Sequence, residues 1–231
     1  MIRGKLKEEL NEFELEIQML LGSHHERTGY IYYFELLHET FTRAANHLML
    51  DSKQFKKDLL SEDRENSQSL IQSNESVSNP LIQTLYNSYF ITVHSELEIM
   101  LSKVNDIIND HFNNSTFPKK TNRGCFRSFI DETKTLSFIT ETLLQYNILI
   151  IYSYIRNGLI HPKNFKGSPE FIELEQYIIE EKITNIEIIE FESKFNFQIT
   201  EIDFIINYSQ EVISFFQDLI DNSKKYSKLK T

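Results

Sequence analysis

Three polar side chains, Arg156, Asn157 and His161, lie at the end of the most apolar stretch of the sequence, residues 148–162. Over residues 143–160 the apolar residues are too dense to form a single stripe, which predicts a helix buried on most of its sides. A residue that precedes proline avoids α geometry, so the helix is expected to end at His161. On a helix, Asn157 and His161 share one face and Arg156 lies beside them.

These three residue types suit the cleavage of RNA without a metal ion. When the 2′-hydroxyl attacks the adjacent phosphorus, the reaction needs a group that transfers protons near neutral pH, as histidine does. It also needs a fixed cation against the phosphate charge, and the arginine guanidinium supplies one with a bidentate fork. Asn157 would hold His161 or contact the phosphate. The alternative is structural: Arg156 caps carbonyls near the helix end, and His161 interacts with the helix dipole.

The segment Arg156-Asn-Gly-Leu-Ile-His161 resembles the signature of the HEPN superfamily (higher eukaryotes and prokaryotes nucleotide-binding). That signature has an arginine, usually a polar residue after it, and then a histidine after a short spacer. The context of the segment agrees, because a long apolar helix precedes it, Pro162 follows it and the surrounding pattern is helical. The resemblance extends over roughly residues 79–222, of which the motif is the specific part.

The resemblance implies a helical bundle that forms a homodimer, in which two Arg/His pairs face each other in one composite cleft. Many members of the family are metal-independent ribonucleases that act as toxins, phage-defence effectors or RNA-processing factors, and others are inactive scaffolds. We therefore expect a metal-independent endoribonuclease, a toxin or phage-defence effector without a cofactor, whose catalytic residues are Arg156, Asn157 and His161. An antitoxin or another defence-system protein is a candidate partner.

Two other functions stay open from the sequence. The first is a non-catalytic, HEPN-like interaction module that binds a partner protein through its N-terminal helices. The second, weaker interpretation is an acidic antitoxin or immunity-type protein that binds a basic effector.

Basic residues flank the motif in two places and are candidates for guiding the RNA strand. Lys163 and Lys166 follow the motif directly. A second cluster precedes the motif helix and consists of Lys119, Lys120, Arg123 and Arg127. The other interpretation is that both groups lie in solvated loops.

Two carboxylates on the long helix before the motif, Glu96 and Glu98, are candidates for supporting roles. In HEPN-like proteins the corresponding helix packs against the motif helix, so either carboxylate would orient His161 or Arg156. The simpler interpretation is that His94 and Glu98, four residues apart, form a polar pair on the exposed face of their own helix.

The composition limits the class of protein. A net charge of −10 argues against broad, non-specific binding to nucleic acid but allows a local basic site. Only 6 Gly and 4 Pro occur in 231 residues, which favours long helices over a turn-rich β fold. The single Cys125 excludes an intramolecular disulfide and fits a reducing compartment. The N-terminal residues do not resemble a signal peptide, and the longest apolar run is shorter than a membrane span. We expect a cytoplasmic protein without a metal site or a membrane partner.

Apolar periodicity predicts a mainly α fold, a HEPN-like antiparallel helical bundle with an N-terminal helical extension. The extension is a pair of helices in residues 1–60, and a polar linker follows in residues 61–79. The helical domain spans residues 80–222 and begins at Asn79-Pro80, an N-cap followed by proline. Within this domain we expect a short helix at 125–135, the motif helix, a short helix from Ser168-Pro169, a small β-hairpin near 186–199 and a final helix after Thr200. Residues 223–231 form a basic tail.

Overall fold

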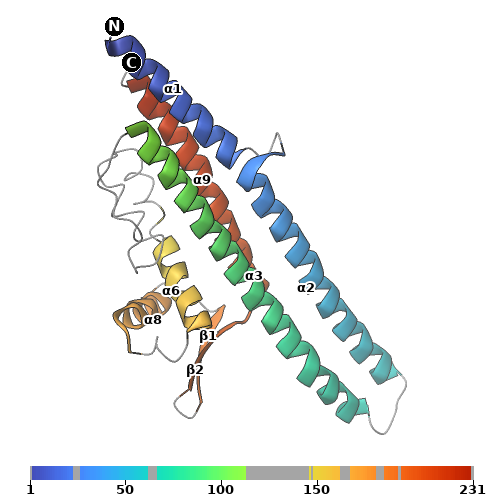
Figure 1. Ribbon diagram of the computed structural model, residues 1–231. Helices are drawn as coiled ribbons and strands as arrows, with labels where there is room; N and C mark the ends of the chain where they lie inside the picture. Colours follow the sequence, from blue (N-terminus) through green and yellow to red (C-terminus); the bar gives the residue numbers. More distant parts are fainter. Residues whose placement is uncertain are drawn as a thin grey trace. The chain divides into compact units, whose positions relative to one another are not determined.

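The computed structural model describes residues 2–22, 27–61, 67–112, 146, 148–161, 167–180, 185–191 and 194–229. Within these ranges the chain forms six helices and one two-stranded sheet, which confirms the mainly α fold (Figure 1). The helices are α1 (Ile2–Leu21), α2 (Gly29–Ser61), α3 (Ser67–Phe112), α6 (Ile148–Ile160), α8 (Pro169–Glu180) and α9 (Ile202–Leu229). The strands are β1 (Ile186–Phe191) and β2 (Lys194–Ile199). No helix in these ranges is both long enough and apolar enough to cross a membrane.

The chain packs as two compact units. Unit 1 comprises Met1–Leu36, Val93–Arg156 and Asn207–Thr231, and unit 2 comprises Leu37–Thr92 and Asn157–Ile206. The boundaries between the units fall inside α2, α3, α6 and α9. Each unit therefore draws its core from segments that are far apart in the sequence.

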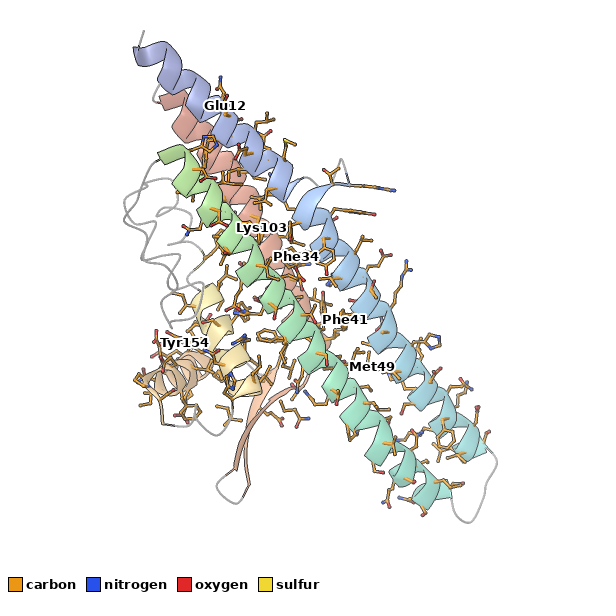
Figure 2. All side chains as sticks on the ribbon, viewed as in Figure 1. Glu12, Phe34, Phe41, Met49, Lys103 and Tyr154 are labelled. Atoms are coloured by element: carbon orange, nitrogen blue, oxygen red, sulfur yellow. The ribbon has the colours of Figure 1, made fainter. Side chains whose placement is uncertain are left out.

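Unit 1 is held together by apolar stripes on α1, α3 and α9. In α1 the stripe recurs at four-residue steps, and in α3 and α9 at three- and four-residue steps. Its buried members include Phe13, Ile17, Leu21, Val93, Leu97, Leu101, Val104, Ile108, Val212, Phe216 and Leu219. Phe34, near the start of α2, stacks on Phe216 with ring centroids 6.1 Å apart (Figure 2). Full burial of one such side chain contributes roughly 1.5–3 kcal/mol, so these stripes fix the positions of the helices in unit 1.

Two glycines fix the turn between α1 and α2. Gly22 and Gly29 both have φ near +69°, a conformation that side chains with a Cβ rarely adopt. A Cβ on Gly22 would overlap the carbonyl oxygen of Thr28, and a Cβ on Gly29 would lie 2.6 Å from the Cα of Gly22. α1 ends at Leu21, and the close backbone approach explains why glycine is needed at both positions.

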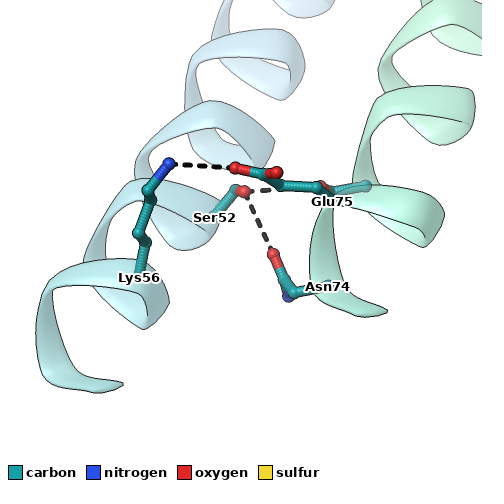
Figure 3. Close-up of polar contacts among 5 residues, drawn as sticks. Ser52, Lys56, Asn74 and Glu75 are labelled. Carbon is teal, nitrogen blue, oxygen red and sulfur yellow. Dashed lines mark hydrogen bonds and ion pairs between the residues drawn. The ribbon is translucent and has the colours of Figure 1, made fainter. Parts of the chain in front are cut away.

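In unit 2, α2 and α3 pair in antiparallel fashion through aromatic and polar contacts. Phe41 stacks on Tyr89 with ring centroids 4.4 Å apart, which anchors one end of the pair. Toward the other end the contacts are polar: Lys56 Nζ donates to Glu75 Oε1 at 3.0 Å, and Ser52 Oγ donates to Asn74 Oδ1 at 3.1 Å (Figure 3).

The helix start predicted at Asn79-Pro80 is wrong. α3 begins at Ser67, so residues 67–79, which the polar composition predicts as a linker, are helical. Ser67 Oγ donates to the carbonyl oxygen of Leu59, and Ile71 is buried. Composition is misleading here because side chains on α2 satisfy these polar groups, and a helix pair of this kind needs few apolar residues. Pro80 lies inside the helix rather than at its first turn.

The remaining elements of unit 2 agree with the predictions. Ser168 caps α8, since its Oγ accepts a hydrogen bond from the backbone N–H of Phe171 at 3.1 Å. β1 and β2 form the expected antiparallel hairpin, with Ile186 opposite Ile199 and both side chains buried. The N–H of Thr200 donates to the carbonyl oxygen of Asn185 at 2.9 Å and closes the hairpin before α9.

The final helix is longer than expected. α9 continues to Leu229, through most of the segment predicted as a basic tail. Lysine and serine are compatible with a helix. The short helix expected at residues 125–135 lies outside the described residues.

The turn between α1 and α2 generates a stability prediction. Gly22→Ala should lower the free energy of unfolding by about 3 kcal/mol or more, because the new methyl group is strained by φ and also meets backbone atoms. Gly167→Ala is the matched control, since Gly167 has φ +78° but no atom within 4 Å of the point that an alanine methyl group would occupy. It should cost only about 1–2 kcal/mol. Urea denaturation measures both, and an equal cost for the two variants would contradict the close approach at Gly22.

Candidate functional site

The predicted motif lies at the end of α6. Arg156 and Asn157 are in the last turns of the helix, and His161 directly follows its final residue. The N–H of His161 donates to the carbonyl oxygen of Asn157 at 2.8 Å, so the helical hydrogen bonding reaches His161 before it stops. The Arg156 side chain is 25% exposed, and His161 is exposed. Arg156 belongs to unit 1, whereas Asn157 and His161 belong to unit 2.

All of the basic residues proposed to guide RNA lie outside the described residues. They are Lys119, Lys120, Arg123 and Arg127 before the motif helix, and Lys163 and Lys166 after it. Their roles stay predictions.

Arg156 pairs with Glu98 of α3. Nη2 of Arg156 lies 3.7 Å from Oε2 of Glu98, and both side chains are about a quarter exposed. An ion pair in this position holds the guanidinium at the edge of the core of unit 1, where part of it still meets solvent. The contact brings together two residues that the sequence proposed as partners, while the catalytic roles assigned to them stay predictions.

Glu96 lies elsewhere. It precedes Glu98 by two residues, about 200° around the helix. It lines a cavity with Tyr30 and Tyr33 of α2 rather than facing Arg156.

His94 is buried, which contradicts the expectation that it pairs with Glu98 on an exposed face. Its exposed fraction is 0%, because it occupies the same broad stripe of α3 as Leu97 and Leu101. His94 Nδ1 lies 2.7 Å from the hydroxyl oxygen of Tyr208 on α9, and the two rings stack at 6.1 Å. On the other side of the ring, Nε2 lies 3.8 Å from Oε1 of Glu98.

Burial keeps both ends of this hydrogen bond uncharged. Desolvation, with a smaller contribution from the charge of Arg156, lowers the pKa of His94 from 6.5 to about 3. Desolvation also raises the pKa of the Tyr208 hydroxyl, and Tyr152 and Glu98 add to that shift. A neutral imidazole has one donor and one acceptor nitrogen. The carboxylate beside Nε2 favours the proton on that nitrogen, so Tyr208 donates its O–H to Nδ1.

α6 is positioned against this hydrogen bond by two tyrosines. Tyr152 packs on Tyr208 with ring centroids 4.3 Å apart. Tyr146, two residues before the helix, donates from its hydroxyl to Asp218 Oδ2 of α9 at 2.7 Å. These contacts place the α6 turn that carries Arg156 beside Glu98.

Neither Tyr208 nor Tyr152 was predicted from the sequence as a member of the site. A signal existed for Tyr208, because it falls in the apolar stripe of α9 four residues before Val212, and a buried tyrosine hydroxyl needs a hydrogen-bond partner. The identity of that partner, 114 residues earlier in the chain, was not encoded in any local spacing.

Within the ranges that the structure describes, no cluster of three or more His, Cys, Asp or Glu side chains forms a metal site. Comparisons with protein-family models, with curated proteins and with solved structures found no match to this chain. The HEPN assignment therefore depends on the motif itself and stays a prediction.

The buried His94 predicts a pH dependence of stability. In the unfolded chain His94 binds a proton below about pH 6.5, whereas in the folded chain it does so only near pH 3. The unfolded state therefore holds more protons between these values, and stability falls as the pH is lowered through this window. The contribution of this one group is about 1.4 kcal/mol for each pH unit.

Urea denaturation of wild type and His94→Asn across this window measures the effect. The variant should show a shallower loss of stability on acidification, because its side chain does not titrate. His47→Asn is the control, since the His47 side chain is 81% exposed, and it should keep the wild-type slope. The same pH slope in His94→Asn and wild type would show that His94 is not buried in its neutral form.

Proposed function

We propose that this protein is a metal-independent endoribonuclease of the HEPN type that acts as a homodimer, as a toxin or a phage-defence effector. The observation that carries the proposal is the position of Arg156. Its guanidinium is held by Glu98 near the end of a buried helix, is partly open to solvent, and is followed by Asn157 and the exposed His161.

The roles of the three residues follow from their chemistry. His161 takes the proton of the 2′-hydroxyl, whose oxygen then attacks the adjacent phosphorus and forms a 2′,3′-cyclic phosphate. The bond to the 5′-oxygen breaks, and that oxygen leaves with the proton that His161 returns as general acid. Arg156 stabilises the negative charge that develops on the phosphate oxygens. Asn157 contacts the phosphate or holds His161.

The support from Glu98 matters because a free arginine side chain samples many rotamers. Fixing it before RNA arrives removes that entropy from the cost of binding the transition state. The ion pair engages Nη2 of the guanidinium, a group whose planar set of five N–H donors matches the oxygens of a phosphate. In the dimer, a second copy of the motif completes the cleft, and the basic residues at 119–127 and 163–166 guide the strand.

A cleavage assay tests this function. Purified protein in excess EDTA should cut RNA, and Arg156→Ala and His161→Ala should each abolish cleavage, because the phosphate charge or the proton transfer then lacks its group. Glu98→Gln should slow cleavage less than either, since it removes only the support of Arg156. Asp106→Asn, an exposed carboxylate on the same helix, is the matched control and should cut like wild type.

Each variant is first checked for folding by circular dichroism and for its dimeric state by sedimentation equilibrium. Cleavage that persists in both alanine variants at the wild-type rate would overturn the proposed site. Absence of cleavage for transfer, messenger and structured RNA, with a folded wild-type protein, would overturn the ribonuclease function.

The second candidate function is a non-catalytic interaction module. The observation that favours it is the number of large apolar side chains exposed on α2 and α3 in unit 2. Leu50, Leu60, Val77 and Leu81 are each more than half exposed. Exposed apolar groups of this size on paired helices are typical of surfaces that bind another protein. The cleavage assay separates the two functions, because a scaffold cuts no RNA and is indifferent to His161→Ala.

A further inference from the structure

A cavity in unit 1 lies beside the turn between α1 and α2, and it does not include the motif residues. Its volume is about 430 Å³, and it is lined by Met19, Leu20, Gly29, Tyr30, Tyr33 and Glu96. Cavities that bind small organic molecules typically have volumes of roughly 300–1,000 Å³. Gly22 and Gly29 approach each other closely beside the cavity, and Tyr30 and Tyr33 follow Gly29 in the first turns of α2.

The two tyrosine rings form walls at nearly a right angle. The ring centroids of Tyr30 and Tyr33 are 6.2 Å apart, and their planes meet at 80°. The face of an aromatic ring carries partial negative charge and attracts a cation within about 6 Å of its centroid. Met19 and Leu20 add apolar surface, which suits methyl or methylene groups.

Glu96 gives the cavity a negative charge. Among the described residues that line the cavity, Glu96 is the only charged one, and it is half-buried. Its negative charge acts on the neighbouring ring: burial raises the pKa of the Tyr33 hydroxyl, and the Glu96 carboxylate raises that pKa further. An anion in the cavity would be repelled by Glu96, and a neutral solute would gain nothing from it.

The side chain of Lys103 already makes a cation–π contact with the ring of Tyr30. Its Nζ donates to the Tyr30 hydroxyl at 2.8 Å and lies 4.9 Å from the centroid of the same ring. This contact occupies the Tyr30 hydroxyl and holds the ring in place. Lys103 follows Glu96 by seven residues, is exposed and is not among the described residues that line the cavity.

We infer that this cavity binds a small organic ammonium ion, with its positive charge against Glu96 and its methyl or methylene groups against Tyr30 and Tyr33. The inference does not depend on the proposed ribonuclease function, because none of the residues involved belongs to the motif.

Titration of the full-length protein with choline, followed by NMR, tests the inference. Choline should bind with saturation, and its uncharged isostere 3,3-dimethylbutan-1-ol should bind at least about tenfold more weakly, because it lacks the charge that Glu96 and the rings recognise. Glu96→Gln and Tyr33→Leu should each weaken choline binding. Glu12→Gln, an exposed carboxylate on α1, is the matched control and should leave it unchanged.

Equal binding of choline and its neutral isostere would overturn the inference, and so would the absence of saturable choline binding. The comparison of the two ligands uses the wild-type protein, so it holds even where a variant fails to fold. A peptide with one trimethylated lysine, titrated in parallel, distinguishes a free ligand from a protein side chain. Tighter binding of that peptide than of choline would overturn the assignment to a small ion.

Discussion

The buried hydrogen bond between Tyr208 and His94 is the constraint on which the arrangement of unit 1 depends. An imidazole at 0% exposure is tolerated only when it is neutral and hydrogen-bonded, and a buried acceptor without its partner costs about 1–3 kcal/mol. The 2.7 Å contact satisfies His94 Nδ1 and the Tyr208 hydroxyl together. α3 and α9 can therefore pack here in only one register, because sliding either helix by a turn would leave both groups unpaired.

The residues connected to this hydrogen bond change from neutral in the interior of unit 1 to charged near its surface. Tyr208 and His94 are neutral in the interior, Glu98 carries a negative charge at the edge, and Arg156 carries the matching positive charge from α6. The two full charges thus lie where about a quarter of each side chain still meets water, which limits the cost of desolvation. A core built in this way presents an oriented guanidinium to the outside, and that is the property which the proposed phosphate chemistry requires.

The local spacing of residues in the sequence predicted most helices and the hairpin. It did not predict which polar side chains would meet each other. The apolar periodicity that includes Phe13 and Ile17 was sufficient for α1, and Ser168-Pro169 was sufficient for the start of α8. The same rules failed for residues 67–79, where polar side chains such as Asn74 and Glu75 pair with side chains of α2.

They failed for His94 as well. A histidine four residues before a glutamate is typical of a polar pair on an exposed helix face. In the fold, however, the face of α3 that contains His94 is buried. Arg156 and His161 could be proposed from the motif alone, but Tyr208 becomes a neighbour of His94 only through the fold, because nothing in a one-dimensional spacing indicates which buried hydroxyl meets which buried ring.

We infer that Glu98, backed by the buried His94 and Tyr208, holds the Arg156 guanidinium in one orientation. The most direct measurement is the side-chain ¹H–¹⁵N NMR signal of Arg156 Nε–H in wild type, Glu98→Gln and the control Asp106→Asn. We expect a sharp, slowly exchanging signal in wild type and Asp106→Asn that broadens and exchanges with water in Glu98→Gln. The same fast exchange in all three proteins would contradict this inference, because Arg156 would then be mobile whether or not its carboxylate partner is present.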